Sequence, residues 1–333
     1  MSDEADPSRR GQAGDRLEQA ARAAWLYYIG GRTQDEIATE LTISRQAAQR
    51  LVSLALTEKL IKFRVDHPIA ACMDLGQALG ERYGLRYCEV VPATGPVGGL
   101  ASVAVAGARY LERWFAQKAP QVLAVSTGRT LRAIAAELSP MDVPQHKLFS
   151  LCGIIAANGR AIATEPVMRM AERTGAQCYP MPLPVIVETV AERELLQSQR
   201  AFQSLREMLE ETRCVMAGIG NIGWQAPLHA SGCITDGELT ELIEAGAVGE
   251  IAGHAFDARG TMIEGSVNDR VTGLALAPNP ARVTVGVGAG PSKVLALRGA
   301  MAGGLVNALI TDEPTAAAIL GDARSDLTIP ERF

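Results

Sequence analysis

Hydrophobic residues between Asp15 and Tyr28 recur every three or four positions, which predicts an amphipathic helix. The Gly30-Gly31 pair is expected to end this helix, because glycine readily adopts the left-handed backbone conformation that follows many helix C-termini. Residues 1–14 are polar and carry almost no hydrophobic side chain, so we expect a disordered tail there.

Two shorter helical patterns follow within residues 33–57. Thr33 can cap the first helix, and Glu36, three residues later, completes a capping box. Ser44 can cap the second helix, residues 45–57, and a short turn around Thr42 separates the two. Two short helices joined by a tight turn predict a helix-turn-helix. Residues 59–65 alternate like a strand and form a candidate wing, so we expect a winged helix-turn-helix domain over residues 15–66.

From Arg86 onward, short hydrophobic runs alternate with amphipathic helical patterns. Strands are expected at residues 87–91, 121–126, 148–152, 176–180, 213–218, 251–256, 282–287 and 305–310. Helices are expected at residues 69–83, 100–117, 129–138, 164–174, 192–211, 237–245, 292–302 and 313–321. This alternation predicts an α/β domain with a doubly wound, Rossmann-like parallel sheet over residues 67–333.

The composition agrees with two soluble domains in a chain of 333 residues, 47% hydrophobic and 21% charged. The net charge of −5 excludes a protein that is basic as a whole. Residues 1–66 hold ten basic and ten acidic side chains, whereas the remainder holds twenty-two basic and twenty-seven acidic ones. Any contact with DNA must therefore come from a local patch, and the N-terminal domain is the better place for it.

The six cysteines lie far apart and form no CxxC motif, which argues against a zinc site. We expect no metal and no cofactor. The chain has no hydrophobic N-terminal signal and no uninterrupted hydrophobic run of about 18 residues. We therefore expect a cytoplasmic protein that does not enter a membrane.

The exposed start of the second short helix carries the candidate DNA contacts. They are Ser44, Arg45, Gln46, Gln49 and Arg50, and Arg32 and Thr33 just before the first short helix are added as contacts to the DNA backbone. Arginine recognises guanine edges and glutamine recognises adenine edges, while a hydroxyl at a helix N-terminus suits a phosphate. The alternative interpretation is a solvated helical hairpin with ordinary surface side chains.

Three glycine-rich loops are candidates for a ligand site, because ligands of open α/β sheets bind beyond the carboxyl ends of strands. The first is Ser126-Thr127-Gly128-Arg129-Thr130, where hydroxyls, backbone N–H groups and an arginine at a helix start suit an anion. The second ends in Gly220-Asn221. The third runs from Gly286 to Lys293, and its lysine opposes the helix dipole unless an anion is bound. A plain strand-to-helix turn is the alternative for each loop.

Two further positions belong to the candidate ligand site. Asp257 follows a predicted strand and could accept hydrogen bonds from sugar hydroxyls, although a turn-forming aspartate is nearly as consistent with the sequence. Gly153 begins a loop near the same edge of the sheet. Asp312 is expected to cap the following helix, because Pro314 stands at an early helical position.

These motifs together resemble the SorC-type sugar-responsive transcription regulators, from about Ala23 to Leu320. The resemblance rests on segments 33–38, 43–45, 125–131, 246–257 and 305–313. It departs from the family at Thr42, where the turn of the helix-turn-helix usually has glycine. Thr127 stands where a larger residue such as tryptophan is common, and residues 153–159 replace a glycine-rich loop.

The resemblance implies a ligand-binding domain related to sugar-phosphate isomerases and deaminases, and a homo-oligomer, expected to be a tetramer, that binds operator DNA. In such proteins the loop matching residues 126–130 holds a phosphate or its equivalent, the lysine matching Lys293 reaches the ligand, and Asp257 matches a position near the bound sugar. The effector would be a sugar, polyol or phosphosugar.

Our prediction is a sugar-responsive regulator and not an enzyme. The first alternative is a sugar-phosphate isomerase or deaminase, for which His254 and Asp257 are the available acid–base groups. Strand alternation points these two side chains to opposite faces unless a bulge intervenes. The second is an NAD-binding protein, which rests on the glycines of residues 286–290 alone.

Overall fold

The computed structural model describes residues 7–61, 70–93, 99–153, 155–156, 159, 166–224, 226–265 and 267–321. The chain divides into two compact units, Met1–His67 and Pro68–Phe333. Each unit has a hydrophobic core of its own, and each is described separately.

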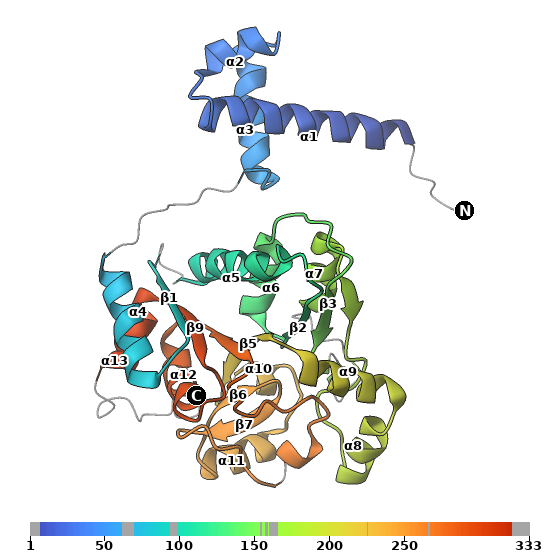
Figure 1. Ribbon diagram of the computed structural model, residues 1–333, viewed down its shortest axis with the longest axis vertical. Helices are drawn as coiled ribbons and strands as arrows, with labels where there is room; N and C mark the ends of the chain where they lie inside the picture. Colours follow the sequence, from blue (N-terminus) through green and yellow to red (C-terminus); the bar gives the residue numbers. More distant parts are fainter. Residues whose placement is uncertain are drawn as a thin grey trace. The chain divides into compact units, whose positions relative to one another are not determined.

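Three helices form the N-terminal unit: α1 (Pro7–Tyr28), α2 (Gln34–Glu40) and α3 (Arg45–Thr57) (Figure 1). They enclose a small core made largely of alanine, with Ala20, Ala24, Ile37, Ala48 and Val52 buried. Small side chains let the three helices approach closely, which is why so few hydrophobic residues suffice.

Helix α1 begins at Pro7, so the disordered tail expected for residues 1–14 is wrong from residue 7 onward. Once the hydrophobic part of a helix is packed, adding further turns costs little, and a polar sequence can extend it. Proline also favours a first helical position, because its φ angle already suits the helix. The polar composition was therefore a poor guide to this segment.

The α2–α3 connection follows the predicted chemistry closely. Thr33 and Glu36 form the expected capping box, and the Ser44 hydroxyl accepts the N–H of Ala47 at 3.2 Å. Helix α2 ends in a Schellman motif, in which the N–H of Ile43 reaches the carbonyl oxygen of Ala38 at 2.9 Å. Thr42 occupies its left-handed position with φ of 55°, where glycine would be unstrained.

The described part of the candidate wing, residues 59–61, does not form a strand. Residues 59–61 form a turn with Lys59 at φ of 55°, and residues 62–65 lie outside the described residues.

The C-terminal unit is built on a parallel sheet with strand order β1-β9-β8-β5-β2-β3-β4 (Figure 1). Its strands are β1 (Tyr87–Val91), β2 (Val122–Val125), β3 (Lys147–Ser150), β4 (Gln177–Tyr179), β5 (Cys214–Asn221), β8 (Val283–Val287) and β9 (Ala308–Asp312). A hairpin of β6 (Ala247–Ile251) and β7 (His254–Asp257) joins the end of β5 in antiparallel fashion. The predicted α/β class with a parallel sheet is confirmed.

Helices cover both faces of this sheet: α5 (Leu100–Phe115), α6 (Arg129–Glu137) and α7 (Val167–Thr174) lie on one, and α4 (Ala70–Tyr83), α9 (Arg200–Glu211), α12 (Val294–Ala302) and α13 (Glu313–Leu320) on the other. The described residues also form α8 (Val190–Gln197), which packs against α9, the short α10 (Pro227–Ala230), and α11 (Asp236–Glu244), which packs against β6. Two single 3₁₀ turns, η1 (Asn268–Arg270) and η2 (Pro291–Lys293), complete the unit.

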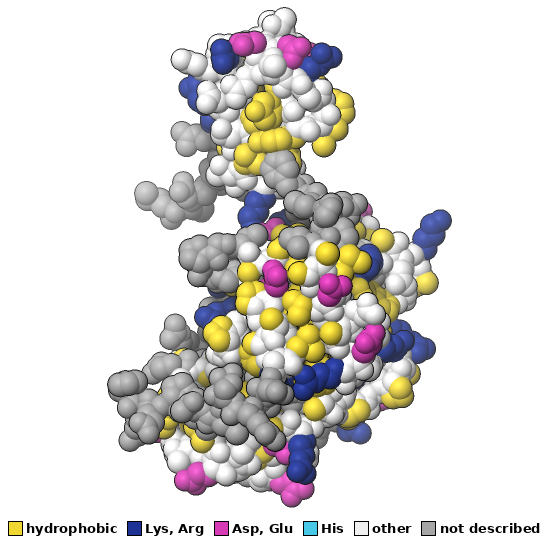
Figure 2. All heavy atoms as spheres, turned by 90° about the vertical axis from the view of Figure 1, so that its left-hand side faces the viewer, with side chains coloured by type: hydrophobic (Ala, Val, Ile, Leu, Met, Phe, Trp, Pro, Cys, Tyr) yellow, Lys and Arg dark blue, Asp and Glu magenta, His cyan; other side chains and the backbone are white. Residues whose placement is uncertain are grey.

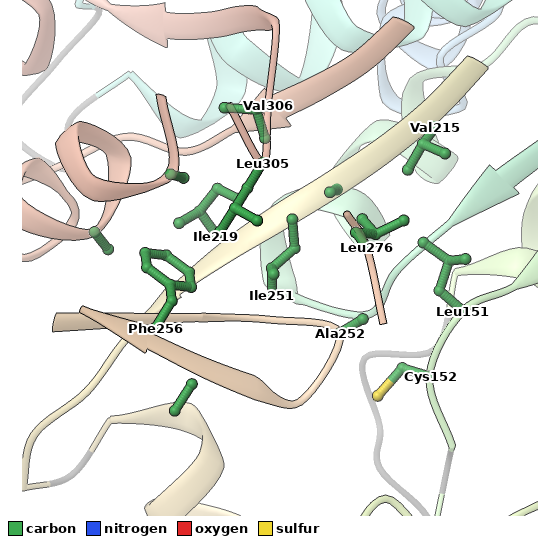
Figure 3. Close-up of a cluster of buried hydrophobic side chains, with 14 of the residues drawn as sticks. Leu151, Cys152, Val215, Ile219, Ile251, Ala252, Phe256, Leu276, Leu305 and Val306 are labelled. Atoms are coloured by element: carbon green, nitrogen blue, oxygen red, sulfur yellow. The ribbon is translucent and has the colours of Figure 1, made fainter. Parts of the chain in front are cut away.

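Successive strand residues enter different cores, as the alternation of a pleated strand requires. Leu123 and Val125 join a core with α5, α6 and α7, whereas Ala124 joins the opposite core with α4, α9, α12 and α13. In the second core, Ile219 of β5 lies beside Ile251 and Phe256 of the hairpin (Figure 3). The hairpin is thus fixed by packing as well as by hydrogen bonds.

Three predicted elements differ from the structure. Residues 251–256 form the tip and second strand of the β6–β7 hairpin instead of one strand, because Ala252 and Gly253 both have positive φ angles and make a two-residue turn. Residues 192–211 form α8 and α9 instead of one helix, with extended backbone at Gln199. The last strand lies at 308–312 and not at 305–310; Leu305 and Val306 are buried before it begins.

Candidate functional site

The loops that follow β2, β5 and β8 meet at one edge of the sheet, because these strands are parallel neighbours. The loops after β2 and β8 carry Ser126–Thr130 and Gly288–Lys293, and Gly220-Asn221 are the last two residues of β5. The sequence therefore located the three segments that the fold brings together.

The loop after β2 leaves the N-terminus of α6 open. Gly128 precedes α6 with φ of 138°, provides no side-chain cap, and has open space where a Cβ atom would stand. The buried Ser126 hydroxyl accepts the N–H of Gly218 at 2.9 Å, which ties this loop to β5. Thr127 and Thr130 are partly exposed and Arg129 is exposed. Free N–H groups beside a guanidinium group make this position suitable for an anion.

Lys293 is the second cation at this edge. Its Nζ donates a hydrogen bond to Oδ1 of Asn221 at 3.1 Å, so the loop after β8 is joined to the end of β5. Burial lowers the pKa of the Lys293 ammonium; the carboxylate of Glu250 raises it, and the guanidinium of Arg129 lowers it. The charges of Lys293, Arg129 and Glu250 therefore interact electrostatically at this edge of the sheet.

Glu250 is a candidate site residue that our sequence analysis missed. It lies on β6 opposite Gly220, where any side chain would collide with its carboxyl group. Its Oε2 accepts the N–H of Gly253 at 2.9 Å. Burial raises the pKa of the Glu250 carboxyl, against the lowering effects of the Gly253 N–H and Lys293. The sequence offered one signal, a charged residue between Gly249 and the buried Ile251. That signal could be interpreted only with the knowledge that β6 is a separate strand.

Two predicted site residues have structural roles in this structure. The Asp257 carboxylate accepts the N–H groups of Arg259 and Thr261 at 2.9 and 2.8 Å, which closes the turn after β7. Asp257 pairs with Ala247, at the opposite end of the hairpin from its tip. Gly153 packs so tightly against the carbonyl groups of Leu183 and Pro184 that a Cβ atom has no room.

His254 is enclosed at the other end of the hairpin. Burial lowers the pKa of its imidazole to about 4, and the nearby Arg193 lowers it further, against a backbone contact with Ala252 that raises it. Its Nδ1 has no hydrogen-bond partner among the described residues. The imidazole is therefore neutral near pH 7.

Asp312 caps α13 as expected. Its carboxylate accepts the N–H of Thr315 at 3.1 Å and that of Gly99 at 2.9 Å. The Thr311 hydroxyl donates to the carbonyl oxygen of Gly288 at 2.7 Å. The Thr311 bond, together with the N–H of Gly290 donated to the Thr315 hydroxyl at 2.8 Å, fixes the loop that carries Lys293.

In the N-terminal unit, the first two turns of α3 expose a polar face. Arg45, Gln46, Gln49 and Arg50 are all exposed, as is Arg32 before α2. Arg45 lies 3.4 Å from the Asp35 carboxylate, and Arg50 donates from Nε to the Gln46 carbonyl at 3.3 Å. Thr33 and Ser44 use their hydroxyls to cap helices.

Comparison with known proteins identifies the family. The model for a "Putative sugar-binding domain" matches residues 67–321, which is most of the chain. The chain is 34% identical to the erythritol catabolism regulatory protein EryD of Brucella abortus (strain 2308), over 91% of this chain and 96% of that protein. This chain belongs to the SorC-type family of sugar-binding transcriptional regulators.

Other relatives of this SorC-type regulator extend the likeness along nearly its whole length. The deoxyribonucleoside regulator of Bacillus subtilis (strain 168) is 28% identical over 92% of this chain and 99% of that protein. The crystal structure of the full-length sorbitol operon regulator SorC from Klebsiella pneumoniae shares the fold, with a TM-score of 0.71 and 20% identity, over 95% of this chain and 100% of that one. Within the described residues, no helix is long and hydrophobic enough to cross a membrane.

Proposed function

We propose that this regulator binds operator DNA through α3 and is switched by a short sugar, polyol or phosphosugar held where the loops after β2, β5 and β8 meet. The observation that carries the proposal is the joining of Lys293, Asn221, Glu250 and Arg129 at one edge of the sheet. Loops at this edge are where ligands of such sheets bind.

The chemistry of this edge suits an anionic polyol. Arg129, Lys293 and the open N-terminus of α6 supply positive charge for a phosphate. Glu250 and Asn221 supply acceptors and a donor for hydroxyl groups. EryD is named for erythritol catabolism, which supports a short polyol or its phosphate as the effector here.

On the DNA side, the polar face of α3 is the surface that we place in the major groove. Arg45, Gln46, Gln49 and Arg50 reach base edges, whereas Arg32 and the capped N-termini at Thr33 and Ser44 meet phosphates. This interpretation makes α2 and α3 a helix-turn-helix, and we retain residues 59–65 as its candidate wing. The regulator names of the relatives support DNA binding.

We further propose a cytoplasmic homo-oligomer, a tetramer in the family pattern. Two copies would present two α3 helices to two half-sites of an operator. Hydrophobic side chains lie exposed among charged ones on the surface of the C-terminal unit, and Met73 of α4 and Val105 of α5 are 57% and 45% exposed (Figure 2). Such positions favour subunit contacts.

A sugar-phosphate isomerase or deaminase is the less supported function. The two acid–base groups that it needed are Asp257, which is bound in a turn, and His254, which is buried on β7. Incubation with phosphosugars followed by NMR should show no turnover.

The proposed function is tested in two steps with the full chain. Thermal-shift measurements with erythritol, other short polyols and their phosphate monoesters should identify a stabilising ligand. Fluorescence anisotropy with genomic DNA fragments should then show sequence-specific binding that this ligand changes. Absence of any sequence preference, with and without ligand, would refute the proposal.

A further inference from the structure

A hollow lies at the edge of the sheet opposite the effector loops. Arg86, Tyr87 and Val283 line it at the starts of β1 and β8, and Tyr110, Arg113 and Trp114 line it at the end of α5. Its volume is about 330 Å³. The effector loops follow the carboxyl ends of parallel strands, which are about 16 Å long, so the hollow is a separate place.

Aromatic rings hold one guanidinium group in this hollow. The Arg113 guanidinium lies 4.9 Å from the ring centre of Tyr110 and 5.2 Å from that of Tyr87. The two tyrosine rings contact each other with centres 4.9 Å apart. Cation–π contacts of this kind restrict the side chain. The guanidinium also forms a hydrogen bond with the Tyr87 hydroxyl, and its fork of five N–H donors leaves others for a ligand.

The carboxylates closest in sequence are bound to groups other than Arg86 and Arg113. Glu89 accepts hydrogen bonds from the Tyr87 hydroxyl and from Arg109. Glu112 accepts the N–H of Ser139 at 2.8 Å. In the part of the chain that the structure describes, neither Arg86 nor Arg113 forms an ion pair; Arg86 donates to the carbonyl oxygen of Pro280 at 3.0 Å. The hollow therefore combines aromatic walls with two cations that lack a carboxylate.

We propose that this hollow binds a small aromatic anion, that is, a flat ring carrying a carboxylate or a phosphate. The ring would stack on Trp114 and the tyrosines, and the anionic group would receive charge-assisted hydrogen bonds from Arg113 and Arg86. The volume falls in the range of small-molecule sites. The site is distinct from the effector edge and does not depend on the function proposed for it.

The test uses the full chain with Trp25 and Trp224 replaced by phenylalanine, which leaves Trp114 as the single tryptophan. The probes are 4-hydroxybenzoate for a carboxylate and AMP for a phosphate, with benzyl alcohol as the uncharged control. We expect saturable quenching by at least one anion and none by benzyl alcohol. If the double variant does not fold, calorimetry with 4-hydroxybenzoate compares the unmodified chain with Arg113→Gln and Lys293→Met, so that binding in the hollow is distinguished from binding at the effector edge.

Arg113→Gln should weaken probe binding at least tenfold. The matched control Arg169→Gln changes an exposed arginine on α7, and Lys293→Met changes the effector edge; both should leave probe binding unchanged. Two results would overturn the proposal: no saturable binding of either anion, or equal binding by Arg113→Gln and the unmodified chain. If Arg113→Gln alters the sedimentation coefficient while neither anion binds, the hollow is a subunit contact instead.

Discussion

Lys293 and Asn221 are joined by a hydrogen bond of 3.1 Å between Nζ and Oδ1, which links the start of α12 to the end of β5. The two residues lie 72 positions apart in the sequence and belong to different elements, η2 and β5. The bond holds a partly buried ammonium group in position before any ligand arrives.

Lys293→Met should abolish the effector response while leaving DNA affinity intact. The change removes a cation and its hydrogen bonds, which are worth about 1.5–3 kcal/mol for a charged group. Effector affinity in thermal-shift titrations should therefore fall by about 10- to 150-fold. An unchanged ligand titration would show that the anion binds elsewhere.

Glu250→Gln should stabilise the ligand-free protein at neutral pH. The folded-state pKa of Glu250 lies above its ordinary 4.5, so its contribution is most favourable below pH 4.5 and is lost as the pH rises through the folded-state value. The variant should show a higher Tm at pH 7 and a flatter Tm profile above pH 4.5. The same Tm at pH 7 would contradict burial of the carboxylate.

His254→Gln should reduce acid sensitivity. The folded-state pKa of about 4 lies below the ordinary 6.5, so the unfolded chain takes up a proton between these values and stability falls as the pH drops. The full effect is on the order of 3 kcal/mol. Glu250 has the opposite effect on stability over part of this pH range. Thermal melts of each variant and of the unmodified chain at pH 7 and pH 5 therefore separate the contribution of His254 from that of Glu250.

Thr42→Gly should stabilise the α2–α3 turn. Threonine at φ of 55° is strained, whereas glycine is not, and the gain is partly offset by the greater flexibility of glycine in the unfolded chain. We expect a net gain of about 0.5–1 kcal/mol. Hydrogen exchange in α2 and α3 of the full chain should slow by roughly two- to fivefold; faster exchange would show that the threonine side chain contributes more than its backbone costs.

Arg45→Ala should weaken operator binding without changing effector binding. Loss of an arginine that reads a base edge costs about 1–3 kcal/mol and relaxes the sequence preference. The exposed contact with Asp35 contributes little to the free protein. Arg22→Ala, an exposed arginine on α1, is the control. Equal losses for both variants in anisotropy titrations would indicate a nonspecific charge effect.

Much of this architecture follows from local sequence because its signals are local. The caps at Thr33, Ser44 and Asp312 appear in the structure as predicted, and the hydrophobic strand runs indicated the parallel sheet. The break at Gln199 lies among residues that all tolerate a helix, so no pattern marked it. The hairpin turn at Ala252-Gly253 lies inside a continuous buried run, which resembles a single strand.

The site was harder to predict because it depends on contacts between distant segments. Ser126–Thr130, Asn221 and Lys293 were identified from the position of their loops. Glu250 acquires its place only through the pairing of β6 with β5, and Asp257 is assigned to a turn only by its bonds to Arg259 and Thr261.

Strand β5 pairs with three strands, β2 and β8 in the parallel sheet and β6 beyond them. Residues Cys214–Gly218 pair with β8, and Ile219–Asn221 pair with β6, so the hairpin is attached to the parallel sheet through three residues. Because the hairpin pairs with the sheet over only three residues, substitutions in the hairpin leave the pairing of the parallel strands unchanged. Related regulators could therefore diversify in the metabolite they recognise by altering this hairpin while inheriting the same scaffold.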